Sequence, residues 1–92
     1  MASLLSDAEI QTQAAQLTGW TVVDKHLEVT RKFKDFLEAI AFVNSLVEPA
    51  EAAGHHPDIE ISYSKVKVVL TTHDAGGLTE KDFALAKVIS EL

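Results

Sequence analysis

Two stretches of the chain alternate apolar and polar residues with a period of two, which is typical of strands whose sheet has one buried face. The expected strands cover residues 20–24, 27–34, 58–63 and 66–70. The short gaps at 25–26 and 64–65 are expected to be tight turns. The pattern therefore predicts two antiparallel hairpins.

Three other segments show helical spacing, and each opens with a capping residue followed three positions later by an acid. These pairs are Ser6 with Glu9, Asp35 with Glu38, and Thr79 with Asp82. The first helix is expected to stop near Gly19, and the last to run to the C-terminus. The apolar positions of that last helix are Phe83, Ala86, Val88 and Ile89.

The middle helix is interrupted by a proline. Its expected apolar stripe is Phe36, Ile40, Val43 and Val47. Inside a helix, Pro49 would lose a hydrogen bond and clash with the preceding turn, at a cost of about 3 kcal/mol. Either the helix ends near Val47 and restarts with Pro49 in its first turn, or it kinks. Both alternatives stay open, and Gly54 is the expected stop.

The order helix, hairpin, helix, hairpin, helix predicts an α+β two-layer sandwich, with three helices on one face of a four-stranded antiparallel sheet. At 92 residues, without linker or repeat, residues 1–92 are expected to form one domain. A domain of this size buries only about 60% of its unfolded surface. Because it has no cysteine to form disulfides, we expect it to self-associate.

Charge and hydropathy exclude several classes of protein. The chain has 8 Lys and Arg against 14 Asp and Glu, for a net charge of −6, which disfavours direct nucleic-acid binding. The longest apolar run, 39–43, is far shorter than the roughly 20 residues that span a bilayer. The first ten residues lack the features of a secretory signal, so we expect a cytoplasmic protein without a membrane partner.

Three of the four histidines flank the second predicted hairpin. His55 and His56 precede its first strand, and His73 follows its second. Because a hairpin brings these two points to the same end, we expect the three imidazoles to share one pocket. His26, in a predicted turn, is expected to be an ordinary surface residue.

Acid–base catalysis is the chemistry that these histidines best support. An unperturbed histidine has a pKa of about 6.5 and exchanges protons near neutrality. A zinc site would need three or four converging ligands, and adjacent side chains such as His55 and His56 point in opposite directions when extended. Glu51 or Asp82 could complete such a site, but the sequence holds neither cysteine nor an HExxH motif. We therefore expect no metal and no cofactor.

The functional positions together resemble one known family, the pterin-4a-carbinolamine dehydratases. The resemblance covers residues 6–92 and includes the Gly19–Trp20 step and the segment KFKDF at 32–36. Its central pattern is Glu51-x-x-x-His55-His56-Pro57, then Tyr63, His73, Gly77-Leu78-Thr79 and Asp82. Two positions depart from it: Gly54, where some members carry a polar residue, and Pro49.

The resemblance implies dehydration of 4a-hydroxytetrahydropterin to quinonoid dihydropterin. It makes His55 and His73 the principal acid–base pair, with His56 assisting in substrate binding and proton transfer. Asp82 and Glu51 would orient the imidazoles or hold the amino-pyrimidine edge of the pterin. Which histidine handles which proton stays open.

The family also implies a homodimer or homotetramer that needs no cofactor. Trp20 would help to wall the substrate pocket, or else belong to the core. The alternative function is a non-catalytic dimerisation or protein-interaction module that acts through the helical face. A further alternative is a chain that has kept the fold for another pathway, but the intact histidine set argues against it.

Overall fold

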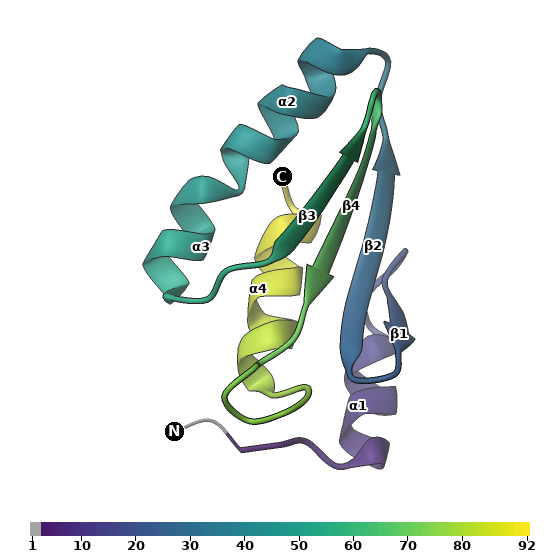
Figure 1. Ribbon diagram of the computed structural model, residues 1–92. Helices are drawn as coiled ribbons and strands as arrows, with labels where there is room; N and C mark the ends of the chain where they lie inside the picture. The colour runs from purple at the N-terminus through teal and green to yellow at the C-terminus, as the bar shows by residue number, and fades with distance from the viewer. Residues whose placement is uncertain (1–2) are drawn as a thin grey trace.

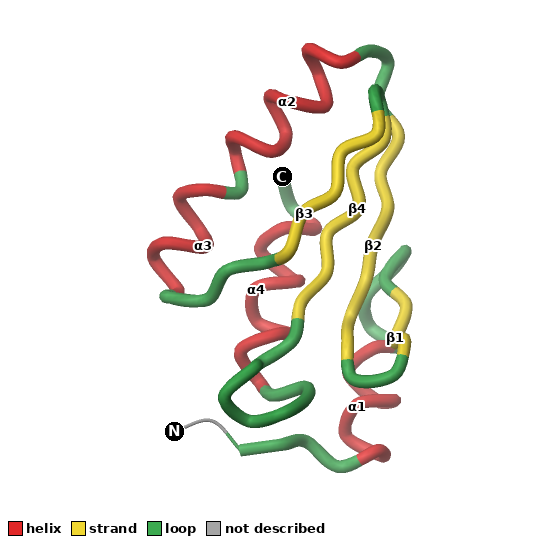
Figure 2. The backbone as a smooth tube through the Cα atoms, in the orientation of Figure 1, coloured by secondary structure: helices red, strands yellow, loops and turns green. Residues whose placement is uncertain are grey.

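The computed structural model describes residues 3–92, shown as a ribbon in Figure 1 and by secondary structure in Figure 2. In chain order its elements are α1 (Asp7–Ala14), β1 (Thr21–Val23), β2 (His26–Lys32), α2 (Phe36–Ser45), α3 (Val47–Ala53), β3 (Asp58–Ser62), β4 (Lys65–Leu70) and α4 (Glu80–Ser90). The order of helices and hairpins is the predicted one, with the middle helix divided into α2 and α3.

The strands form one antiparallel sheet in the order β1-β2-β4-β3. Both hairpins are present, and β2 pairs with β4 to join them. Alternate residues of the two central strands are buried on the face that carries the helices: Leu27, Val29, Val66, Val68 and Leu70. This arrangement confirms the predicted α+β fold.

Both hairpin turns lie one residue earlier than predicted. The first turn is Asp24–Lys25, so His26 is the first residue of β2 and pairs with Val23, which makes its assignment to the turn wrong. The second turn is Tyr63–Ser64. Asp24 and Tyr63 have φ of 53° and 52°, the left-handed backbone that two-residue hairpin turns require. Alternation alone cannot locate such a turn, because a non-glycine residue supplies the left-handed conformation in both.

The structure decides between the two alternatives for Pro49 in favour of a break and restart. α2 ends at Ser45, and α3 begins at Val47, so that Pro49 is its third residue. A proline is tolerated there because the first backbone N–H groups of a helix have no partner within it. Gly54 ends α3 with a φ of 60°, as its predicted role as a helix stop requires.

The buried face of α2 and α3 is not the predicted stripe. Its buried residues are Ala39, Phe42 and Ala50, together with Leu46 between the two helices. Phe36 and Val47, the two ends of the predicted stripe, are 51% and 58% exposed. Spacing gives the period of a helical stripe, but its phase depends on which side contacts the sheet.

The two terminal helices also differ in detail from the prediction. α1 ends at Ala14 rather than near Gly19, since a turn follows it. Its capping box is formed, and the backbone N–H of Ser6 lowers the pKa of Glu9. In α4, Val88 is 45% exposed, and Leu85 takes a place in the core. Within residues 3–92, no helix is long and apolar enough to cross a membrane.

Candidate active site

The loop after α3 sends its two histidines in different directions. Left-handed Gly54 ends the helix, and the backbone N–H of His55 donates to the carbonyl of Ala50 at 3.1 Å. The His55 ring then turns inward to Asp82, whereas His56 pairs with Glu51 at the surface. The divergence follows the rule that adjacent side chains of an extended segment point to opposite sides.

His55 and Asp82 form the buried centre of the site. The His55 Nε2 and Asp82 Oδ1 atoms are 2.6 Å apart, and the side chains are 11% and 0% exposed. Asp82 lies in the first turn of α4, where it completes the capping box with Thr79. The positive end of the helix and the capping contact both favour a carboxylate at this position.

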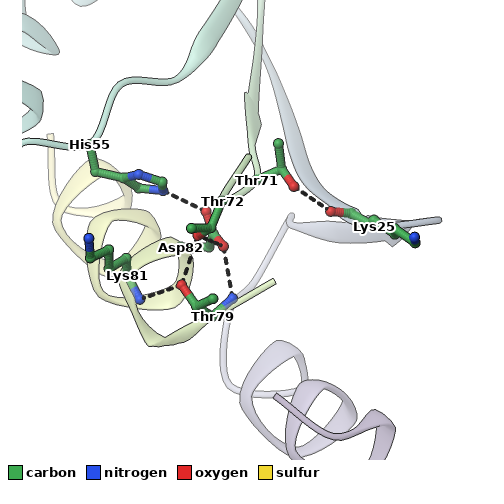
Figure 3. Close-up of polar contacts among 7 residues, drawn as sticks. All are labelled: Lys25, His55, Thr71, Thr72, Thr79, Lys81 and Asp82. Carbon is green, nitrogen blue, oxygen red and sulfur yellow. Dashed lines mark hydrogen bonds and ion pairs between the residues drawn. The ribbon is translucent and has the colours of Figure 1, made fainter. Parts of the chain in front are cut away.

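The second oxygen of Asp82 is held by two further donors, as Figure 3 shows. The backbone N–H of Thr79 donates to Oδ2 at 2.9 Å, and the Thr72 hydroxyl donates to the same atom at 2.8 Å. With Oδ2 accepting both of these bonds, the carboxylate presents Oδ1 as an acceptor to His55. Opposite a carboxylate oxygen, a neutral His55 ring is favoured with its proton on Nε2, an arrangement that leaves the Nδ1 lone pair free to accept a proton.

His73 follows directly after Thr72, at the start of the turn that leads to α4. This turn is closed by the Thr72 N–H, which donates to the carbonyl of Gly77 at 3.1 Å. The His73 side chain is exposed and makes no hydrogen bond to another described residue. Through Thr72 and Asp82, the segment that carries His73 is joined to His55, as the hairpin argument predicts for these segments.

The histidines do not all line one hollow within a single chain. His55 borders a mainly apolar hollow of about 410 Å³ between α3 and α4, whose other walls include Ala52, Lys81 and Leu85. His56 borders a separate hollow of about 270 Å³ together with Glu51. The expectation that all three imidazoles share one pocket is therefore not met for His55 and His56.

Trp20 lies away from these side chains. It is 7% exposed in the hydrophobic core, and its indole Nε1 donates to Ser90 Oγ at 2.8 Å. Ser90 is the last residue of α4, whereas Asp82 is in the first turn of the same helix. The position of Trp20 fits the alternative that it belongs to the hydrophobic core. It gives no support to the predicted role of Trp20 in substrate binding.

The described residues include no group of three or more His, Asp or Glu side chains arranged to hold a metal ion. The two imidazole–carboxylate pairs point in different directions, so each offers one nitrogen and one carboxylate group rather than a converging set of ligands. The arrangement is instead suited to proton transfer.

Two threonines in the site were not predicted from the sequence as functional residues. Thr79 was identified as a helix cap and as a position of the family pattern, without a functional role, and Thr72 was not identified at all. The available signal for Thr72 is its place directly before His73, two residues after β4, whose partner strand β3 leads back to His55.

Comparisons with known proteins identify the family of this chain. A family model described as pterin 4 alpha carbinolamine dehydratase matches residues 3–92. A relative from Trichormus variabilis, provisionally named as such an enzyme, is 73% identical over 92 residues, which cover 100% of this chain and 99% of the relative. A relative from Chloroflexus aurantiacus with the same provisional name is 54% identical over 88 residues, covering 96% and 95% of the two chains.

Two solved structures are similar as well. A crystal structure of a transcriptional coactivator/pterin dehydratase from Brucella melitensis has a TM-score of 0.90 at 34% identity and covers 95% of each chain. A pterin dehydratase-like protein identified as a RuBisCO assembly factor in the alpha-carboxysome has a TM-score of 0.63 at 22% identity, covering 78% of this chain and 83% of that one; this second likeness concerns the fold alone. From the match over residues 3–92 and the high identity of its relatives, the chain belongs to the pterin 4 alpha carbinolamine dehydratase family.

Proposed function

We propose that the protein catalyses the dehydration of 4a-hydroxytetrahydropterin to quinonoid dihydropterin. The observation that carries this proposal is the His55–Asp82 pair, in which a buried carboxylate holds one imidazole nitrogen and leaves the other free. Family membership supports the substrate class, and the apolar hollow beside His55 offers a surface for a flat bicyclic ring.

The reaction needs one proton donor and one proton acceptor. The donor protonates the hydroxyl group on C4a, so that the C–O bond breaks and water leaves. The acceptor removes the proton from the neighbouring ring nitrogen, and a C=N double bond forms. A well-placed general acid or base typically contributes about 10²–10⁴-fold to such a rate.

The geometry favours His55 as the proton acceptor. Its Nε2 proton is directed to Asp82, so Nδ1 is the nitrogen that can take a proton from the substrate. The buried carboxylate then stabilises the imidazolium that forms. His73, which is exposed, would supply the proton to the leaving oxygen and be reprotonated from solvent, while His56 and Glu51 would bind the polar edge of the pterin.

Replacing His73 by alanine is expected to lower the dehydration rate by about 10²-fold, the smaller end of the range for a general acid, because water can partly substitute at an exposed position. Fold and oligomer size should not change, since the His73 side chain makes no hydrogen bond to another described residue. The rate is measured on synthetic carbinolamine by the absorbance of the product.

His26→Ala is the matched control, because His26 lies on β2 outside the site. Full activity in His73→Ala would remove His73 from the mechanism. A wild-type protein without any dehydratase activity would instead favour the interaction module, and a double variant His55→Ala/His73→Ala that still captured the same partner protein would support it.

We also propose that the protein self-associates through the edge strand β3, in a homodimer or as part of a homotetramer. All five residues of β3 are exposed, and Ile59 and Ile61 are 37% and 43% exposed on the helix-bearing side. An unpaired edge with apolar side chains is a surface that a second copy can cover by extending the sheet. Separately, we propose a cytoplasmic location for the protein.

Ile61→Lys is expected to shift the protein toward the monomer. Joining the two β3 edges would bury a lysine from each copy, and the two positive charges would repel one another. Val23→Lys, on the opposite edge strand β1, is the control and should leave the assembly intact. Sedimentation velocity measures the outcome. An unchanged oligomer in Ile61→Lys would exclude β3 as the interface.

A further inference from the structure

The hydroxyl groups behind Asp82 form a chain with a single direction. Thr72 Oγ1 lies 2.8 Å from Thr79 Oγ1 and donates its one proton to Asp82 Oδ2 at 2.8 Å. With that proton committed, Thr72 can only accept from Thr79. Thr79 Oγ1 donates its proton to Thr72 and accepts the Lys81 N–H at 3.3 Å.

These groups are closed off from solvent. Thr79 and Asp82 are 0% exposed, and Thr72 is 7% exposed. Among residues 3–92, every buried side-chain nitrogen or oxygen atom has a hydrogen-bond partner. A buried hydroxyl that turned away from its acceptor would have no water molecule to donate to, which costs free energy. The direction of these hydrogen bonds is therefore fixed by the fold.

Thr72 also anchors the turn that carries His73. Its carbonyl accepts the N–H groups of Ala75, Gly76 and Gly77 at 3.1, 3.0 and 3.3 Å. The side chain of Thr72 therefore orients the carboxylate that faces His55, and its backbone fixes the segment that begins with His73. Thr72 therefore contacts both halves of the site.

We propose that Thr72 is a positioning residue, whose hydroxyl group fixes Asp82 so that neutral His55 keeps its proton on Nε2 and its lone pair on Nδ1. This inference rests on the proposed function only for its effect on rate. The tautomer of His55 is a property of the resting protein and is measured without substrate.

The primary measurement is long-range ¹H–¹⁵N NMR of His55 at a pH where the ring is neutral. Wild-type protein is expected to show the Nε2–H tautomer. Thr72→Val removes the hydroxyl while keeping the side-chain shape, so a part of His55 should change to the Nδ1–H tautomer. We expect kcat to fall about 10-fold, the effect of one lost hydrogen bond to a charged group, with KM within about 2-fold of wild type.

Two variants separate positioning from packing. Thr72→Ser keeps the hydroxyl and should restore both the tautomer and most of kcat. Thr71→Val removes a neighbouring buried hydroxyl that donates to the Lys25 carbonyl at 2.7 Å and points away from Asp82 in Figure 3. Thr71→Val should therefore keep the wild-type tautomer and kcat.

The result that overturns the proposal is an unchanged Nε2–H tautomer in Thr72→Val. A wild-type His55 that carries its proton on Nδ1 overturns it equally, and this measurement needs no variant to fold. If the tautomer responds as expected but wild-type protein does not dehydrate carbinolamine, Thr72 stands as a positioning residue and the proposed function fails.

Discussion

Replacing His55 by alanine is expected to lower the rate of carbinolamine dehydration by about 10²–10⁴-fold, because the imidazole that accepts the substrate proton is lost. Its Nδ1 is the only nitrogen of the His55–Asp82 pair that is free to do so. The rate is measured with synthetic carbinolamine at neutral pH. Free imidazole added to this variant should recover part of the rate, since the vacated space lies beside the open hollow.

A second substitution separates the proton transfer from the support that His55 gives to Asp82. His55→Gln keeps a side-chain N–H donor for the buried carboxylate but has no group that accepts a proton near neutrality. It should fold and melt close to wild type and remain inactive. Wild-type rates in His55→Gln would show that the His55 ring is not the base.

Among substitutions in the candidate site, replacing Asp82 is expected to destabilise the folded protein most. Asp82→Ala leaves three donors without their acceptor: the Thr72 hydroxyl, the Thr79 N–H and His55 Nε2. Two of these are buried, and a capping box is broken as well, so the free energy of unfolding should fall by about 3 kcal/mol. Urea denaturation followed by circular dichroism measures this change.

The matched control for Asp82→Ala is Glu9→Ala, which removes the acid at the same position of the other capping box. Glu9 is exposed, and water can replace the contact that it makes with the Ser6 N–H at 2.8 Å. Its removal should therefore change the stability only slightly. Equal losses for the two variants would show that the cap, rather than the buried network, stabilises the Asp82 region.

Asp82→Asn distinguishes the role of the carboxylate in catalysis from its role in stability. The Thr72 and Thr79 donors require an oxygen on their side, so the amide NH₂ group would face His55. His55 Nε2 must then accept, and its proton moves to Nδ1. We expect a dehydration rate lower by about 10²–10⁴-fold, as for other imidazole bases held in the wrong tautomer, with a smaller loss of stability than in Asp82→Ala.

Local patterns in the sequence predicted most of the fold. The two hairpins followed from period-two alternation, and the helix starts from the residues Ser6, Asp35 and Thr79, all of which act as caps. These features depend on neighbours within a few residues, so the sequence records them directly. The turn positions were wrong by one residue, because Tyr63 adopts a left-handed backbone that its residue type does not indicate.

The candidate site was predictable as a set of residues but not as a set of contacts. The spacing of His55, His56 and His73 around a hairpin predicted that they lie at one end of it, and the pairing of β3 with β4 places their segments there. It did not show that His55 pairs with Asp82 while His56 pairs with Glu51, since that depends on how the loop leaves α3.

By itself, the sequence determined the α+β class, the two hairpins and the identity of the chemical groups, because each is set by local spacing and residue type. Only the tertiary structure decided which face of α2 is buried, since the phase of a stripe depends on the surface that it meets. It also decided the place of Thr72, because a hydroxyl group becomes directional only when packing excludes water and leaves it one acceptor.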